Sequence, residues 1–338
     1  MADREGMTRV GVALLAIAGS GLLVAAAPAD GTLLSMTRRA SMRAYELLDN
    51  VGRGEFPKAV YEHARLQRDF DVVDIRYAST GDGGASVPGV LIRPVKVDGR
   101  QWPVIIYNRG GTGDVGRIDD LTIADLYLLA KEGFVVIASD YRFHGARAKH
   151  DEWGGADVND VLSLVRLAQS LEIVDRNRLF MLGVERGGMM TYLALKHGVP
   201  VKAAAVIAGP SDLEALGQDR PELVRGDDLY GGWMRVWPDF THRSAEHYRA
   251  RSLAYWADRI QVPVLILHAK DDRLIPLGQS LRAALALKEA GVRHDVQVYL
   301  NDSHSLSRHR DDRNQRIVDW FRDAISETRS QGAHRVSR

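Results

Sequence analysis

Three short segments carry side chains that could perform acid–base or nucleophilic chemistry. The first is the run GVERGG at residues 183–188, whose glycines allow a tight turn around Glu185 and a close approach of neighbouring backbone. The second holds Asp272, four residues after His268, and the third holds His304. A carboxylate beside an imidazole orients it, so that the imidazole can transfer a proton to or from a bound ligand. We therefore take Glu185, Asp272 and His304 as candidate catalytic residues.

Each of these segments follows an expected strand. Apolar runs predict buried strands at residues 103–107, 134–139, 178–182, 202–208, 263–268 and 295–300, and shorter strands at 71–77 and 87–93. Amphipathic spacing predicts helices at residues 121–132, 157–171, 186–197, 278–290 and 311–325. Strands that alternate with helices indicate an α/β fold, with a mostly parallel central sheet and helices on both faces. Ligands of such sheets bind beyond the carboxyl ends of the strands, where the candidate residues lie.

Two regions depart from this alternation. Residues 209–260 contain seven aromatic residues and lie between two strands, which is too long for an ordinary connection and predicts a helical cap insertion. A surface insertion that packs its own aromatics is the alternative. Residues 36–66 have helical spacing. The expected domain organisation is an N-terminal segment (1–29), a helical extension (30–68), the α/β domain (69–328) and a disordered polar tail (329–338).

The N-terminal 29 residues have the pattern of a signal peptide. Arg4 and Arg9 precede an uncharged run over residues 10–29 that ends in small residues. We expect export to the periplasm or the medium, with start sites at Met1 or Met7. An uncleaved membrane anchor formed by residues 10–29 is the alternative. After cleavage, no membrane association is expected.

Composition excludes several classes of protein. The 338 residues include 45 Lys and Arg against 44 Asp and Glu, a net charge of +1 that argues against a general nucleic-acid binder. The chain has no cysteine, which rules out disulfides, thiolate metal sites and a cysteine nucleophile. No spacing suggests a metal site or a nucleotide-binding loop, so we expect neither a metal nor another cofactor.

The order of the three candidates along the chain is that of the α/β-hydrolases. More specifically, residues 70–328 resemble the catalytic domain of the prolyl oligopeptidase family of serine peptidases. The likeness rests on Gly-x-Glu-x-Gly-Gly at 183–188, His-x-x-x-Asp-x-x-Ile-Pro at 268–276, and the final histidine followed by Trp320 and Phe321. Asp175 and Arg178 before the Glu185 strand add to it. We expect no counterpart of that family's N-terminal β-propeller in these residues.

The resemblance implies a role for each candidate. Asp272, rather than its neighbour Asp271, would be the triad acid and His304 the base. The backbone N–H groups of Arg186 and of the loop at Gly110 would form the oxyanion hole. Glu185 occupies the position at which the family has its nucleophilic serine.

A glutamate at that position leaves three interpretations open. A carboxylate that attacks an amide would give an anhydride, which is less stable than the amide, so conventional serine hydrolysis is doubtful. The chain could be a pseudo-hydrolase that only binds its ligand, with the carboxylate in its own oxyanion hole. Alternatively, Glu185 could act as a nucleophile at saturated carbon or as a base that activates water. Finally, Ser139, Ser211 or Ser303 could serve as a displaced nucleophile. In each case the expected ligand is a small ester or a short peptide.

Overall fold

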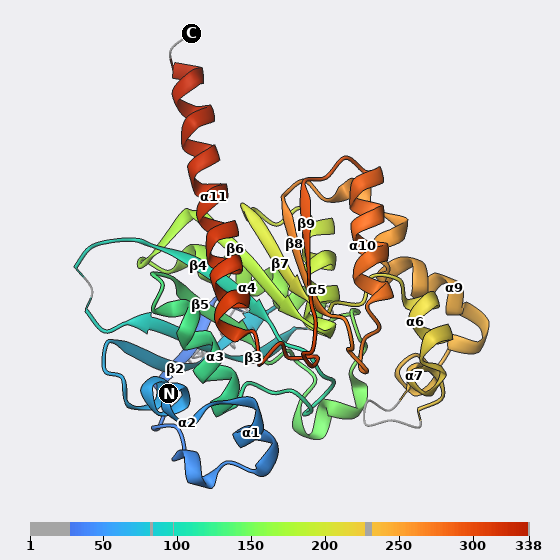
Figure 1. The fold of residues 1–338 in the computed structure, drawn as a ribbon, viewed down its shortest axis with the longest axis horizontal. Coiled ribbons are helices and arrows are strands. Elements are labelled where there is room, and N and C mark those ends of the chain that lie inside the picture. The colour runs from blue at the N-terminus through green and yellow to red at the C-terminus, as the bar shows by residue number, and fades with distance from the viewer. Residues whose placement is uncertain (1–27, 82–83, 97, 227–231, 337–338) are drawn as a thin grey trace, which may run out of the picture.

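The computed structural model describes residues 28–81, 84–96, 98–226 and 232–336. Within this part of the chain, nine strands form one sheet in the order β1-β2-β3-β5-β4-β6-β7-β8-β9 (Figure 1). The strands are β1 (Leu33–Arg38), β2 (Phe70–Ser79), β3 (Ala85–Pro94), β4 (Trp102–Asn108), β5 (Val135–Ser139), β6 (Val174–Val184), β7 (Ala203–Ile207), β8 (Val264–Ala269) and β9 (His294–Tyr299). The six strands from β5 to β9 in this order pair in parallel, and β1, β2 and β3 add an antiparallel edge.

Helices cover both faces of the sheet. They are α1 (Asn50–Glu55), α2 (Lys58–Leu66), α3 (Asp120–Ala130), α4 (Val158–Ser170), α5 (Arg186–Lys196), α6 (Leu213–Asp219), α7 (Pro221–Arg225), α8 (Trp233–Val236), α9 (Phe240–Arg251), α10 (Gly278–Glu289) and α11 (Arg310–Val336). One apolar core unites the sheet with α4, α5, α10 and the α6–α9 region, and the other unites it with α2, α3, α11 and the residues Leu48 and Phe56 that flank α1. The apolar run of β4 serves both, since Val104 and Ile106 enter the first core and Ile105 the second. The predicted α/β-hydrolase fold, with a mostly parallel sheet between two helical layers, is confirmed.

The strand order places the site. After β4 the chain crosses to β5 on one side, and it then returns to β6 on the other side of β4. Such a reversal separates the loops that follow the two strands and leaves a crevice between them. The loop that begins at Arg109 follows β4, and Glu185 follows β6 directly. The two segments therefore face each other at the carboxyl edge of the sheet.

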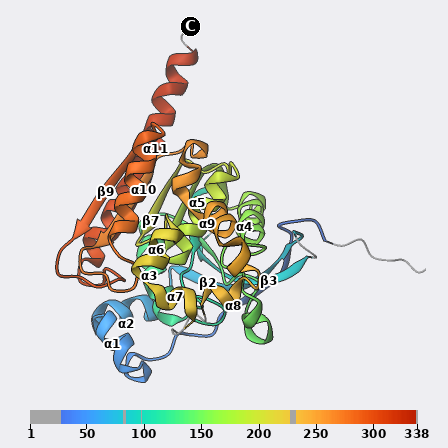
Figure 2. The same cartoon turned by 90° about the vertical axis from the view of Figure 1, so that its right-hand side faces the viewer.

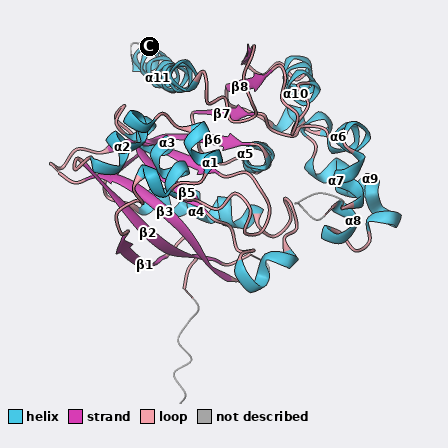
Figure 3. Ribbon diagram, turned by 60° about the horizontal axis from the view of Figure 1, so that its bottom comes forward, coloured by secondary structure: helices cyan, strands magenta, loops and turns pink. Residues whose placement is uncertain are grey.

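The insertion between β7 and β8 is helical, as predicted for the cap. Helices α6 to α9 gather on one side of the molecule (Figure 3). The indole N–H of Trp237 donates to the carbonyl of Glu152 at 2.8 Å, and Nε of Arg251 donates to the carbonyl of Trp153 at 2.7 Å. The insertion is thus fastened to residues 152–153, close to the site.

Both ends of the chain differ from expectation. The helix predicted over residues 36–66 is wrong at its start, because residues 33–38 form β1 against β2, and Pro57 then separates α1 from α2. Edge pairing in the sheet outweighs the weak helical spacing there. Helix α11 continues through Val336, past its predicted end at residue 325, and projects beyond the body of the molecule (Figures 1 and 2).

The predicted signal peptide lies almost wholly outside the described residues. No helix in the described ranges is both long and apolar enough to cross a membrane.

Candidate active site

Glu185 lies on a strained turn between β6 and α5. Its backbone has φ 53° and ψ −124°, a region that non-glycine residues rarely adopt. Neighbouring glycines make the turn possible: a Cβ on Gly187 would overlap the carbonyl oxygen of Asn108, and one on Gly183 would overlap the carbonyl oxygen of Gly187. This is the sharp strand-to-helix turn expected from GVERGG, and it presents the Glu185 side chain at the carboxyl edge of the sheet.

The Glu185 carboxylate is turned toward the loop after β4. It is 4% exposed, and its Oε2 accepts a hydrogen bond from the backbone N–H of Gly111. The predicted donor of this loop was Gly110, so the donor lies one residue further along. Gly110 instead packs its Cα against the carboxylate, where an added Cβ would come 2.5 Å from Oε2. Gly111 has φ 75°, which glycine adopts without strain and which turns its N–H toward the elbow.

Asp272 and His304 meet across the ends of β8 and β9. Nδ1 of His304 lies 2.7 Å from Oδ2 of Asp272. The other carboxylate oxygen, Oδ1, accepts the backbone N–H groups of Leu274 at 2.8 Å and Ile275 at 3.0 Å. The expected contact is therefore present, and it involves Asp272 rather than the exposed Asp271. Because Nδ1 is occupied, Nε2 of His304 is the ring nitrogen available to a ligand or to water.

His268 is a fourth member of the site and was not among the three candidate catalytic residues. Its Nε2 lies 2.8 Å from the carbonyl oxygen of Ile275 and 3.2 Å from Oδ2 of Asp272. A carbonyl only accepts, so Nε2 carries a proton and donates. Nδ1 of His268 faces the hydroxyl of Ser280 at 2.6 Å. The spacing of four residues between His268 and Asp272 was the available signal for this contact.

These hydrogen bonds set the charge of both partners. Burial alone would raise the pKa of Asp272, but hydrogen bonds from His268 and His304 hold that pKa well below its ordinary value. Burial alone would lower the pKa of His304, but the hydrogen bond and charge of Asp272 and the charges of Glu185 and Glu55 raise it above its ordinary value. The imidazole thus lies among three carboxylates that favour its protonated form.

Glu55 was not predicted as part of the site. It ends α1, and its Oε2 accepts the hydroxyl proton of Ser305 at 2.5 Å, next to His304. The contact brings a carboxylate from the N-terminal extension to the candidate site. No spacing in the sequence signals it, since 250 residues separate the two partners.

A buried carboxylate shapes the loop that carries His304. Oδ1 of Asp302 accepts the N–H of Ser303 at 2.8 Å and that of Arg308 at 3.3 Å. Its Oδ2 accepts the N–H of His309 at 3.0 Å and faces Nδ1 of the same residue at 2.8 Å. Asp302 thereby closes the loop on both sides of His304.

Two arginines near the elbow have structural contacts. The backbone of Arg186 begins α5 directly after Glu185, as an N–H donor at this position requires, while its side chain is buried and paired with Asp151 and Asp157. Arg109 precedes Gly110 in the loop after β4. It is 1% exposed, and its guanidinium donates to the carbonyls of Gly110, Gly113, Val115 and Asp140. It organises the loop after β4.

The three serines proposed as alternative nucleophiles differ in their exposure. Ser139 is fully buried and accepts hydrogen bonds from the Tyr77 hydroxyl and the Tyr141 N–H. Ser211 is 1% exposed and donates to the carbonyl of Gln279 at 2.6 Å. Neither can reach a ligand. Ser303 is exposed beside His304, with its hydroxyl 3.2 Å from that of Ser305.

A cleft of about 740 Å³ opens beside His304. Helix α1 contributes Gly54 and Glu55 to one wall, and the loop after β8 contributes Asp271 and Arg273 to the other. The mixture of charges suits a polar ligand. His304 lines this cleft, whereas Glu185 lies in the buried part of the site.

Comparisons with known proteins identify the family of this chain. Residues 120–328, which contain all three candidate side chains, match the model of the prolyl oligopeptidase family. The uncharacterized peptidase YtmA of Bacillus subtilis is 29% identical over 208 residues, which cover 61% of this chain and 76% of YtmA. Dipeptidyl-peptidase 5 of Porphyromonas gingivalis is 25% identical over 240 residues, which cover 68% of this chain but 34% of that protein.

Solved structures agree on the fold. Pyrococcus horikoshii acylaminoacyl peptidase superposes with a TM-score of 0.62 at 23% identity, over 77% of this chain and 43% of that one. A Mycobacterium tuberculosis puromycin-hydrolyzing peptidase gives a TM-score of 0.62 at 24% identity, over 79% of this chain and 40% of that one. This chain thus spans less than half the length of these two proteins. With the elbow, the Asp272–His304 pair and the matched residues in agreement, the chain belongs to the prolyl oligopeptidase family of peptidase-like hydrolases.

Proposed function

We propose that this protein binds short peptides or small esters in a hydrolase site that cannot form an acyl-enzyme, because Glu185 occupies both the nucleophile position and the oxyanion hole. The observation that carries the proposal is the hydrogen bond from the Gly111 N–H to the Glu185 carboxylate. That N–H is the group that would otherwise stabilise the oxyanion of a bound substrate. The carboxylate resembles the acid product of hydrolysis held in place permanently.

The chemistry supports a large loss of acyl transfer. Removing the nucleophile of a serine hydrolase costs on the order of 10⁶ in turnover. In an enzyme that keeps its nucleophile, loss of one oxyanion donor alone lowers turnover by a factor of about 10² to 10³. Burial alone would lower the pKa of His304, but the charges of Asp272 and Glu185 raise it, which favours the form of the imidazole that cannot accept a proton.

A second candidate function has one observation in its favour. Nε2 of His304 is free of Asp272, and the charge of Glu185 acts on the same imidazole. A water between Glu185 and His304 could be activated. Alternatively, Glu185 could displace a leaving group, which departs with its bonding electrons, from a saturated carbon, and that water could open the alkyl ester so formed. This reaction predicts turnover that depends on both Glu185 and His304.

The deciding experiment compares wild-type protein with Glu185→Ser. Both are treated with a fluorophosphonate probe and with a panel of aryl esters and aminoacyl-anilides. We expect only Glu185→Ser to become labelled and to turn over substrate, and we expect His304→Ala in that background to lose the activity by a factor of about 10⁴ or more. Peptide binding to the wild type is measured by calorimetry on the same panel.

Three outcomes would contradict the proposal. Turnover by the wild type that is lost in both His304→Ala and Glu185→Gln would establish the second candidate. Wild-type turnover that survives Glu185→Gln but is lost in Ser303→Ala would assign the reaction to the exposed serine. If folded Glu185→Ser neither labels nor turns over, the remaining site is not a latent serine hydrolase.

We also propose that the protein is exported. The support is the sequence pattern of Arg4 and Arg9 before an uncharged run over residues 10–29. Fractionation of the producing cells, with mass determination of the mature N-terminus, tests it. Release as a shortened soluble chain supports a cleaved signal, full-length chain in the membrane supports an anchor, and full-length chain in the cytoplasm contradicts export.

A further inference from the structure

We propose that Arg186 is the positioning residue of the oxyanion hole: its side chain, held by Asp151 and Asp157, fixes the loop that contains Gly111 against the elbow. The inference rests on the proposed function, because it takes the Gly111 N–H as the donor that Glu185 occupies. The backbone of Arg186 follows Glu185 directly and is part of the elbow, while its side chain reaches the facing loop. One residue therefore connects the elbow with that loop.

The contacts of Arg186 span three segments of the chain. Nη1 donates to the carbonyl of Gly111 at 2.9 Å and to Oδ2 of Asp151 at 2.6 Å. Nη2 donates to Oδ1 of Asp151 at 2.6 Å and to Oδ2 of Asp157 at 2.5 Å. The fork of the guanidinium matches the Asp151 carboxylate with two parallel hydrogen bonds, a geometry that lysine cannot reproduce.

The partners of Arg186 hold the same loop at further points. Oδ2 of Asp151 also accepts the N–H of Gly113 at 2.7 Å. The indole N–H of Trp153 donates to the hydroxyl of Thr112, and the Trp153 backbone N–H donates to Oδ1 of Asp151 at 3.0 Å. Residues 111, 112 and 113 are therefore each tied to Arg186 or to the segment at 151–157.

Burial makes this arrangement rigid. Arg186 and Asp157 are fully buried and Asp151 is 3% exposed. Burial alone would lower the pKa of Arg186, but the charges of Asp151 and Asp157 raise it above its ordinary value, so the guanidinium stays charged. Buried charges of this kind tolerate no loss of a partner. The guanidinium also lies over the ring of Tyr141, with 5.3 Å to the ring centroid.

Gly111 is the residue that needs such a restraint. Glycine has the widest backbone freedom, and the direction of the Gly111 N–H depends on its φ and ψ. Its N–H binds Glu185 on one side and its carbonyl binds Arg186 on the other. Releasing the carbonyl would let the N–H turn away from the elbow.

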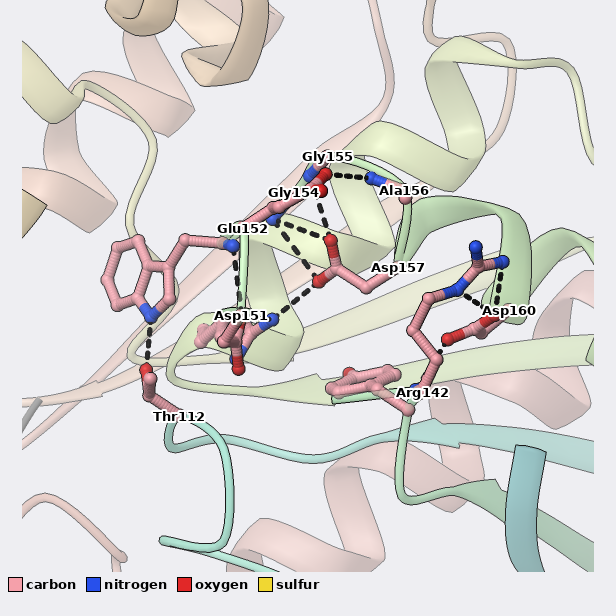
Figure 4. Close-up of polar contacts among 12 residues, drawn as sticks. Thr112, Arg142, Asp151, Glu152, Gly154, Gly155, Ala156, Asp157 and Asp160 are labelled. Carbon is pink, nitrogen blue, oxygen red and sulfur yellow. Dashed lines mark hydrogen bonds and ion pairs between the residues drawn. The ribbon is translucent and has the colours of Figure 1, made fainter. Parts of the chain in front are cut away.

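The experiment replaces one buried arginine at a time. Arg186→Lys removes the fork, and Arg142→Lys is the control, because Arg142 is also buried and also makes two hydrogen bonds to a buried carboxylate: its Nε and Nη2 donate to Oδ1 of Asp160 at 2.9 and 2.8 Å (Figure 4). Each protein is labelled with ¹⁵N-glycine, and the Gly111 amide is assigned by Gly111→Ala. We expect Arg186→Lys to speed exchange of the Gly111 amide proton by about tenfold or more relative to wild type and to shift its resonance upfield. Arg142→Lys should change neither, even where it lowers the melting temperature equally.

A second variant keeps the proposal testable if Arg186→Lys does not fold. Asp157→Asn removes one carboxylate from Arg186 and leaves Asp151 on Gly113, so we expect a smaller change of the same sign at Gly111. A folded Arg186→Lys or Asp157→Asn protein with wild-type exchange and shift at Gly111 would overturn the inference. So would an equal change in Arg142→Lys.

A kinetic measurement separates this inference from the proposed function. In the Glu185→Ser background, Arg186→Lys should lower kcat by about 10²-fold and leave KM unchanged, since only the oxyanion of the transition state loses its donor. A loss in KM alone would contradict a role in the hole. If Glu185→Ser has no turnover, the proposed function fails, while the amide measurement still decides the role of Arg186.

Discussion

The two halves of the candidate site are built differently. On the elbow side, Glu185 and Arg186 are at most 4% exposed and the glycines of the turn leave no room for a methyl group. On the histidine side, the His304 side chain is 24% exposed and lines an open cleft. In the first half, the Glu185 carboxylate occupies the N–H of Gly111. In the second half, Asp272 binds Nδ1 of His304 and leaves Nε2 available. A glutamate on the elbow is therefore compatible with a formed pair of carboxylate and imidazole on the other side of the site.

The largest contrast should appear when a methyl group is added to each half. Gly187→Ala places a Cβ on the carbonyl oxygen of Asn108, so we expect the free energy of unfolding to fall by about 3 kcal/mol. Gly54→Ala is the control in the cleft wall, where no atom lies within 4 Å of the added Cβ. Because Gly54 is helical, we expect a gain of about 0.5 kcal/mol. Urea denaturation measures both, and equal effects would show that the elbow is no tighter than the rim.

The next contrast concerns what holds His304 in place. Asp302→Asn replaces an acceptor that receives hydrogen bonds on both oxygens, so we expect a loss of about 2 kcal/mol, against less than about 0.5 kcal/mol for the exposed Asp271→Asn.

This effect should depend on pH in a defined direction. Burial alone would raise the pKa of Asp302, but hydrogen bonds from His309 and the loop amides lower it. A lowered carboxyl pKa stabilises the fold above the unfolded value of about 4 and loses that effect as pH falls through the folded value. The gap between wild type and Asp302→Asn should therefore narrow below about pH 4. A gap that does not change with pH would indicate that the charge of Asp302 is irrelevant.

The smallest expected effect couples the two halves. The pKa of His304 is raised partly by Glu185, so this contribution to stability is complete below the unfolded pKa of about 6.5 and is lost as pH rises through the higher folded pKa. Glu185→Gln keeps an acceptor for the Gly111 N–H but removes the charge. We expect it to lower the free energy of unfolding more at pH 6 than at pH 9, and the two losses should differ by less than about 1 kcal/mol. Glu246→Gln, on the exposed face of α9, is the control. An equal loss at both pH values would mean that Glu185 and His304 do not interact.

Much of the fold could be predicted because its signals are local. The apolar runs of β4 to β8 and the periodicity of α3, α4, α5 and α10 are each contained in fewer than 15 residues. The prediction for the N-terminal extension was partly wrong because β1 depends on pairing with β2, whose paired residues lie at least 35 positions later. Side-chain contacts at the site divide in the same way. His268 and Asp272 are four residues apart in the sequence, whereas Glu55 and Ser305 are 250 residues apart.

The sequence by itself determined the order of elbow, acid and histidine, and it placed each of them after a strand, because motif spacing and hydrophobic patterning are local properties. It also determined that a glutamate, Glu185, stands at the centre of the GVERGG turn. Only the tertiary structure decided which N–H meets that glutamate, that Arg186 faces Asp151 and Asp157 rather than a ligand, and that α1 forms a wall of the cleft. These outcomes depend on how loops after different strands meet at the edge of one sheet, and no periodicity along the chain encodes that meeting.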